Sequence, residues 1–130
     1  MYSLVTEEIK VSVRSEFSPE HSEPSDNRYF WTYMIEIANL GGRTVKLTHR
    51  HWKITDAGGR VEEVGGPGVV GEQPTLKPGE TFTYASGCPL KTPSGIMAGS
   101  YRMVDEDGRG FDVAIPAFSL DSPYAKRVLN

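Results

Sequence analysis

The sequence predicts an all-β fold, a two-sheet antiparallel β-sandwich of about seven strands. Apolar and polar residues alternate with a period of two in several segments, as they do in strands that bury one face. Turn residues separate these segments, and the 130 residues include 14 Gly and 9 Pro, more than the average share. The length suits a single domain over residues 1–130, with a core from about residue 5 to about residue 120 and a tail over residues 121–130.

Residues 5–14 form the first predicted strand. Val5, Ile9, Val11 and Val13 share one parity, and the residues of the other parity from 8 to 14 are polar. This period-two pattern indicates a strand with one buried face. Residues 18–27, with two prolines and several acids, are predicted to form a polar loop.

Residues 28–40 form the strongest predicted strand. Large apolar residues at odd positions from Tyr29 to Ile37 mark one face, and Phe30 and Met34 make the other face partly apolar. A strand that is apolar on both sides is typical of a sheet centre. We therefore expect cover on both faces for at least part of its length.

Residues 44–55 form a strand in which the apolar phase changes. Val45 and Leu47 are odd, whereas Trp52 and Ile54 are even. Since a shift of one residue exchanges the two faces of a strand, this change predicts a bulge or a crossing between sheets. A turn over residues 56–59 and a short strand over residues 60–64 follow.

The remaining elements alternate between turns and short strands. Residues 65–78 are predicted to form a long loop rich in Gly and Pro, which ends in a type II turn centred on Pro78 and Gly79. Strands are predicted at residues 80–85, around residues 101–103 and at residues 111–115, with a second loop over residues 88–95. Asp107 and Gly108 indicate a hairpin turn.

Composition excludes several classes of function. The net charge is -3, so the overall field does not attract nucleic-acid backbones, and general nucleic-acid binding is not expected. Cys88 is the single cysteine, so no intrachain disulfide can form, which favours a cytoplasmic protein. The sequence shows neither a signal peptide nor an apolar run long enough to span a bilayer, so no membrane association is expected.

Six ordered runs resemble the bacterial ApaG proteins. They cover residues 50–56, 59–64, 66–74, 76–80, 86–90 and 93–97. The resemblance extends from about residue 5 to residue 120 and implies a sandwich like those of fibronectin type III and immunoglobulin domains. It implies no reaction, because the family has no established enzymatic activity. The family is linked in a general way to cobalt tolerance and magnesium efflux, and related domains in eukaryotic proteins imply a protein-binding role.

The motif G-x-G-x-x-G occurs at residues 66–71. In dinucleotide-binding folds this motif opens a helix, but Pro74 and Pro78 follow here, and no βαβ unit is predicted. Backbone N–H groups of such a loop could still hold a phosphate or pyrophosphate anion. The simpler interpretation, which we favour, is a loop whose glycines adopt positive φ.

His49 and His51 lie two residues apart on one side of a predicted strand. Two imidazoles so placed could begin a divalent-metal site, but a third ligand stands at no recognisable spacing. Cys88 has no base at a recognisable spacing, so we interpret it as a small buried side chain. The acidic run at residues 105–107 resembles a calcium loop but lacks the closing glutamate, so we interpret it as a solvated turn.

We therefore predict a non-catalytic module, without a cofactor, that binds another protein through residues 65–78. The candidate contact residues are Gly66, Pro67, Gly68, Val69, Val70, Gly71, Glu72 and Gln73. A small phosphate anion on the same glycines is the alternative, and a metal at His49 and His51 is a third. Dimerisation through exposed strand edges stays open.

Overall fold

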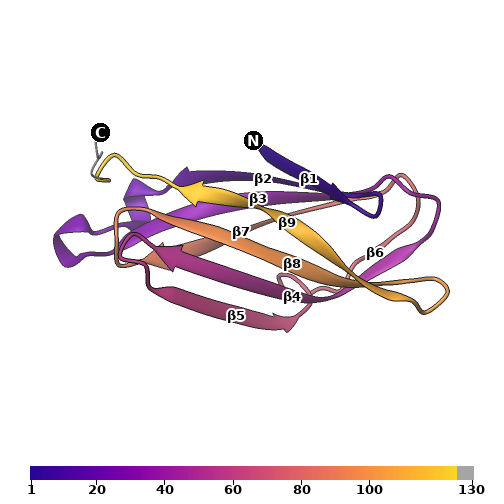
Figure 1. Cartoon of the computed structure of the whole chain (residues 1–130). Coiled ribbons are helices and arrows are strands. Elements are labelled where there is room, and N and C mark those ends of the chain that lie inside the picture. The colour runs from indigo at the N-terminus through magenta and orange to yellow at the C-terminus, as the bar shows by residue number, and fades with distance from the viewer. Residues whose placement is uncertain (126–130) are drawn as a thin grey trace, which may run out of the picture.

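A computed structural model describes residues 1–125 and shows two antiparallel sheets packed face to face (Figure 1). The first sheet has the strand order β1-β2-β3-β7, made by β1 (Tyr2–Thr6), β2 (Ile9–Phe17), β3 (Tyr29–Asn39) and β7 (Thr81–Leu90). The second has the order β5-β4-β8-β9, made by β5 (Val61–Pro67), β4 (Val45–Asp56), β8 (Gly95–Asp105) and β9 (Gly110–Leu120). The short β6 (Thr75–Leu76) also pairs with β4. The predicted all-β sandwich is confirmed.

The core lies between the sheets and follows the predicted parity. In β3 the odd-numbered residues from Tyr29 to Asn39 are all buried, and Trp31 and Ile35 are fully enclosed. They face Tyr101 and Met103 of β8, which are equally enclosed, and residues of β9. Burial of such side chains contributes about 1.5–3 kcal/mol each, so this layer dominates the stability of the fold.

The first predicted strand is two strands. Residues 5–14 were expected to run straight, but the chain reverses at Glu7 and Glu8, which join β1 to β2. Both glutamates have positive φ, 46° and 67°, as the central residues of a type I′ turn require. Because this turn favours Asn and Gly, two glutamates gave no turn signal. With β6, this hairpin explains why residues 1–125 form nine strands rather than about seven.

The prediction for β3 is confirmed. The strand lies at the centre of its sheet, between β2 and β7, as expected. Its outward face is covered over part of its length, because Phe30 is half-buried and its ring centroid lies 5.6 Å from that of His21. Further along, the same face is open, and Met34 is 48% exposed.

The predicted bulge in β4 is confirmed. The register against β8 shifts between Leu47 and His49, which leaves Thr48 as the extra residue. The shift turns Val45 and Leu47 inward before the bulge and Trp52 inward after it.

Two predicted loops contain strand residues. β5 continues through Gly65, Gly66 and Pro67, and β7 continues through Cys88 to Leu90, although Gly and Pro suggested loops at both places. Both strands are sheet edges, where Gly and Pro are tolerated because one side of the strand needs no partner. The two 3₁₀ turns, η1 (Pro19–His21) and η2 (Pro24–Asp26), lie in the predicted polar loop.

The two flanks of the sandwich differ. On one flank β9 passes beside β1 and β2, where the Ser15 hydroxyl donates to the Ser119 carbonyl (3.1 Å) and the Ala114 N–H donates to the Thr6 hydroxyl (3.3 Å) (Figure 1). The opposite flank is bordered by β7 and β5, the other outer strands of the two sheets. No helix that could cross a lipid bilayer occurs in residues 1–125.

Candidate functional site

The loop that follows β5 is fastened to the bulge of β4. The carbonyl of Thr48, which the bulge frees from the ladder with β8, accepts the N–H of Gly68 (2.8 Å) and the side-chain amide of Gln73 (2.9 Å). The N–H of Leu47 donates to the Pro74 carbonyl at 3.0 Å. These three hydrogen bonds therefore fasten both ends of the loop to β4, at Gly68 on one side and at Gln73 and Pro74 on the other.

Residues 69–72 form a tight reversal at the tip of this loop. Val69 and Glu72 exchange both backbone hydrogen bonds, at 2.8 and 2.9 Å. The two central residues, Val70 and Gly71, have φ of 45° and 81°. A β-branched residue at positive φ is a genuine outlier, since its Cβ crowds the backbone there.

Val69 and Val70 differ in exposure. Val69 is fully buried and belongs to the core, whereas Val70 is 54% exposed. Val64 of β5 is 37% exposed and borders the same hollow of the surface as Val70. We call Val64 and Val70 the valine patch.

The backbone geometry explains why glycine stands at the first two glycine positions of the motif. The Arg50 guanidinium lies against Gly66, where a Cβ would come within 3.3 Å of both Nη atoms. A Cβ at Gly68 would lie 2.2 Å from the Glu72 carbonyl oxygen, so no larger residue fits. The N–H groups of Gly68, Val69 and Glu72 already donate to protein carbonyls, which leaves those of Val70 and Gly71 at the tip. Phosphate binding by this loop stays a prediction.

A cleft of about 360 Å³ opens between the sheets beside this loop. Its walls come from the loop tip and from β3, β4, β5, β7 and β8. They comprise Tyr33, Arg50, Trp52, Ile54, Glu62, Val64, Val69, Val70, Tyr84, Ser86, Gly87, Cys88, Pro89 and Met97. A mostly apolar lining with a few polar groups, at this volume, is typical of a binding cleft.

Arg50 is the cation of this cleft, and the loop holds it. Its Nη1 donates to the carbonyls of Pro67 (2.9 Å) and Gly68 (3.0 Å). The guanidinium therefore ties β4 to the loop while its charge borders the cleft. Glu62 lines the cleft from β5 and makes no ion pair with any residue in 1–125.

The thiol and the phenol groups that line the cleft are held in their neutral, protonated form. Burial raises the pKa of the Cys88 thiol to about 11, and the nearby Glu62 charge adds to this rise. Burial also raises the pKa of Tyr33 and of Tyr84, whose hydroxyl is hydrogen-bonded to that of Tyr101 at 2.5 Å. A thiol so protonated is a poor nucleophile, so Cys88 fits the predicted role of a small buried side chain.

His49 and His51 lie on the outward face of β4, away from the cleft. His51 Nε2 lies 3.1 Å from a Glu63 carboxylate oxygen, whereas His49 Nδ1 lies 3.1 Å from the Thr48 hydroxyl. Among residues 1–125, no three His, Cys, Asp or Glu side chains converge as metal ligands. The structure therefore brings His51 to one acid and does not bring it together with His49 around a common point.

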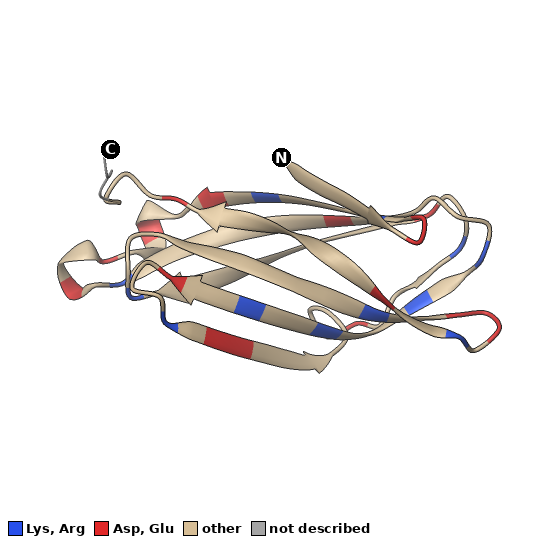
Figure 2. Cartoon of the chain, in the orientation of Figure 1, with Lys and Arg blue, Asp and Glu red and all other residues tan. Residues whose placement is uncertain are grey.

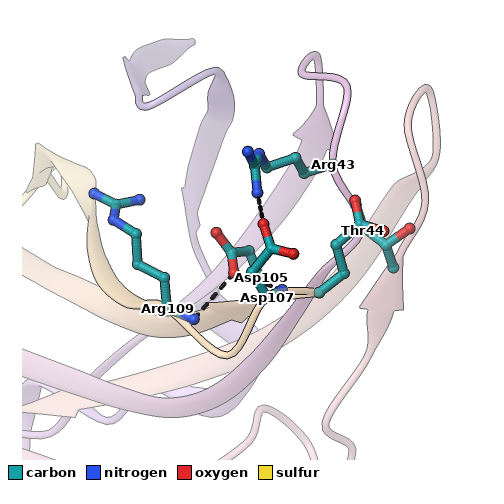
Figure 3. Close-up of polar contacts among 6 residues, drawn as sticks. Arg43, Thr44, Asp105, Asp107 and Arg109 are labelled. Carbon is teal, nitrogen blue, oxygen red and sulfur yellow. Dashed lines mark hydrogen bonds and ion pairs between the residues drawn. The ribbon is translucent and has the colours of Figure 1, made fainter.

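A second hollow, of about 520 Å³, lies at the far end of the sandwich. Both of its arginines are paired: Arg43 with Asp107 (Figure 3), and Arg109 Nη2 with Glu7 at 2.7 Å. The acidic run that resembled a calcium loop is a hairpin turn, in which the Asp105 carboxylate accepts the N–H of Asp107 and of Arg109 (Figure 3). The arginines of this hollow and Asp105 are thus engaged in contacts within the chain.

Sequence reasoning found the loop and missed the cleft. Arg50 and Val64 were not predicted as site residues. The one signal was in β5, where Val61 and Val64 have opposite parity, so at least one of them had to lie outside a regular buried face. The walls of the cleft come from five strands, and no sequence spacing brings them together.

Comparison with known proteins agrees with the resemblance of the six runs. The family model described as the ApaG domain matches residues 19–105. Protein ApaG of Beijerinckia indica subsp. indica is 63% identical and Protein ApaG of Methylocella silvestris is 64% identical, each over 130 residues and 100% of both chains. A crystal structure of a protein described as ApaA from Bordetella pertussis superposes with a TM-score of 0.87 at 49% identity, covering 90% of this chain and 95% of that one.

Proposed function

The chain belongs to the ApaG domain family, and from this membership and the geometry of its loop we propose that it is a non-catalytic module that binds another protein. The docking surface is the loop of residues 65–78 together with the valine patch of Val64 and Val70. The sandwich supplies a rigid support, and the irregular connection supplies the contact.

The backbone of Val70 carries this proposal. Glycine or asparagine would hold the same turn without crowding, yet a valine stands there and exposes 54% of its surface. Strain that stability does not require points to a use for the side chain. Apolar side chains at the centre of a contact surface, with polar residues around them, are what a protein partner buries.

The cleft beside the loop supports a binding role over a catalytic one. Its thiol and its phenols are held protonated by burial, so none of them is poised as a base or nucleophile near neutral pH. Its one cation, Arg50, is engaged with two loop carbonyls and so acts as a brace.

Affinity recovery from bacterial cell extract tests the proposal. The intact chain is compared with a variant carrying Val64→Thr and Val70→Asn, which keeps the turn and removes the apolar surface. We expect the variant to lose proteins that the intact chain retains. The control is Val5→Thr on β1, because Val5 is 53% exposed and lies outside the patch.

Equal recovery by the patch variant and the control would contradict the proposal. The same holds if the intact chain retains nothing above the level of an unrelated sandwich protein. Near-identical unfolding curves for the two variants ensure that any difference in recovery comes from the surface.

A further inference from the structure

β7 is an outer strand whose free side borders the cleft. Within residues 1–125 it pairs with β3 alone. The N–H of Asn39 donates to the Glu80 carbonyl (3.0 Å) at the start of this ladder. Since hydrogen-bonded pairs recur every second residue in an antiparallel ladder, the even-numbered residues of β7 bond to β3, and Thr81, Thr83, Ala85 and Gly87 turn their N–H and C=O groups outward.

This edge lacks the usual protection against pairing. The ten residues of β7 include no Lys, Arg, Asp or Glu. Natural edge strands generally carry charges, bulges or a covering segment that prevent another strand from pairing with them. Pro89 is the sole such feature in β7, and it stands next to the last residue. The outward groups of Thr83, Ala85 and Gly87 therefore form an open template for an added strand.

An added strand at this edge would direct every second side chain into the cleft. There it would meet Trp52, Ile54 and Val64 across the gap between the sheets, with the exposed Val70 beside them. Side chains of a pairing segment alternate with the same period as those of β7, so the inward ones would be apolar.

The negative charge at the rim of the cleft favours a partner segment that carries a basic side chain. Glu62 stands there without an ion pair in residues 1–125, and it adjoins Glu63 on β5, where the two appear as one red segment (Figure 2). Arg50 is already held by the carbonyls of Pro67 and Gly68. A Lys or Arg among the inward side chains would therefore complement Glu62.

We propose that β7 receives an extended segment of a partner protein as an added strand, with apolar side chains in the cleft and a Lys or Arg against Glu62. This inference rests on the proposed function and specifies the class of partner. A second copy of this chain fits less well. A two-fold pairing of β7 with itself would bring the Glu62 side chains of both copies toward each other, and β7 itself offers no basic residue.

A peptide-display selection tests the inference. Random peptides of roughly ten residues, long enough to form one strand, are selected on the immobilised intact chain, and the enriched sequences are synthesised. We expect alternating apolar residues and a Lys or Arg in the apolar register. Ala85→Pro removes one outward N–H and should weaken binding about tenfold or more, whereas Ala85→Ser, which keeps that N–H, should not.

Two further measurements keep the inference open to contradiction if Ala85→Pro does not fold. Glu62→Lys should prefer a peptide in which Glu replaces the basic residue. By NMR, the amide protons of Thr83, Ala85 and Gly87 should exchange rapidly in the free chain and slowly with peptide, whereas those of Tyr84 and Ser86 should be slow in both.

The outcomes that would contradict strand addition can be told apart from those that would contradict the proposed function. No enrichment, or equal binding to Ala85→Pro and Ala85→Ser, would overturn the inference. Protection of Thr83, Ala85 and Gly87 that rises with protein concentration, without peptide, would assign the edge to a second copy. If extract proteins are lost by the valine-patch variant but kept by Ala85→Pro, strand addition fails and the proposed function stands. If both variants keep them, both proposals fail.

Discussion

Val70 occupies a backbone conformation that opposes stability. At φ 45° an L-residue costs about 1–2 kcal/mol relative to its favoured regions. Glycine adopts this conformation freely but loses about 0.5–1 kcal/mol more backbone entropy on folding than other residues do. Since the Val70 side chain is largely exposed, its removal sacrifices little burial.

Val70→Gly is therefore expected to raise the free energy of unfolding by about 0.5–1 kcal/mol. Urea unfolding followed by tryptophan fluorescence measures the change, and Trp31 and Trp52 in the core report it. Val70→Ala is the control, because alanine keeps the crowding at positive φ and should not stabilise. A loss of stability in Val70→Gly would show that the side chain supports the fold, and the argument from strain would fail.

At the scale of elements, parity predicted most strands because it depends only on which side chains face the core. The phase change between Leu47 and Trp52 revealed the bulge, since the whole buried series moves to the other parity. The end of β5 escaped prediction because Gly65, Gly66 and Pro67 lie on an edge, where Gly and Pro cost little.

The site was predicted in part for the same reason. A long segment rich in Gly and Pro is local, and so the sequence itself indicated the loop of residues 65–78. The cleft depends on the order of strands in two sheets, which brings Arg50, Glu62 and Cys88 to one place. The spacing of residues along the chain does not predict the order of the strands in the two sheets.

The β1–β2 hairpin offers a prediction for an element as a whole. Glu7 and Glu8 occupy both positive-φ positions of a type I′ turn, for which Asn-Gly is preferred. Glu7→Asn with Glu8→Gly should stabilise the chain by about 1–2 kcal/mol. The exposed pair of Glu7 with Arg109 would be lost, but such pairs contribute about 0–1 kcal/mol.

Thermal unfolding of this double variant measures the gain, and Arg109→Gln alone measures the ion pair. A melting temperature below that of the Arg109→Gln variant would mean that the two glutamates favour the turn through contacts other than this pair. The close approach of Glu8 to Gly41 is the first such contact to examine.

At the scale of the whole molecule, the closed flank contributes contacts that stabilise the sandwich, and the open flank contains the cleft proposed to bind a partner. The closed flank joins the sheets through β9, and the indole N–H of Trp31 donates to the Asp121 carbonyl at 2.8 Å. Within residues 1–125, the open flank joins them through the buried contact between the hydroxyls of Tyr84 and Tyr101 and, at one end, through the Asn39 side-chain amide, which donates to the Leu76 carbonyl at 3.0 Å. Opening of the open flank should therefore cost less than opening of the closed one, which suits a cleft that admits a partner.

The same open flank makes global stability sensitive to alkaline pH. Burial raises the pKa of Cys88 from its ordinary value of 9.0 to about 11, and it raises the pKa values of Tyr33, Tyr84 and Tyr101 above 10.0. At neutral pH these groups are protonated in both states and do not affect the balance. As the pH approaches and passes 9, the unfolded chain releases protons that the folded chain retains, so the free energy of unfolding falls.

The thiol alone should lower the free energy of unfolding by about 2 kcal/mol between pH 9 and pH 11. Urea unfolding at a series of pH values from 7 to 11 measures this decline. Cys88→Ala should reduce the decline over that interval and leave the tyrosine contribution, which develops as the pH approaches and passes 10. A free energy of unfolding that stays constant up to pH 11 would show that water reaches the cleft freely enough to solvate the thiolate and the phenolates. In that case the inner wall of the cleft would be too wet to receive apolar side chains from a partner.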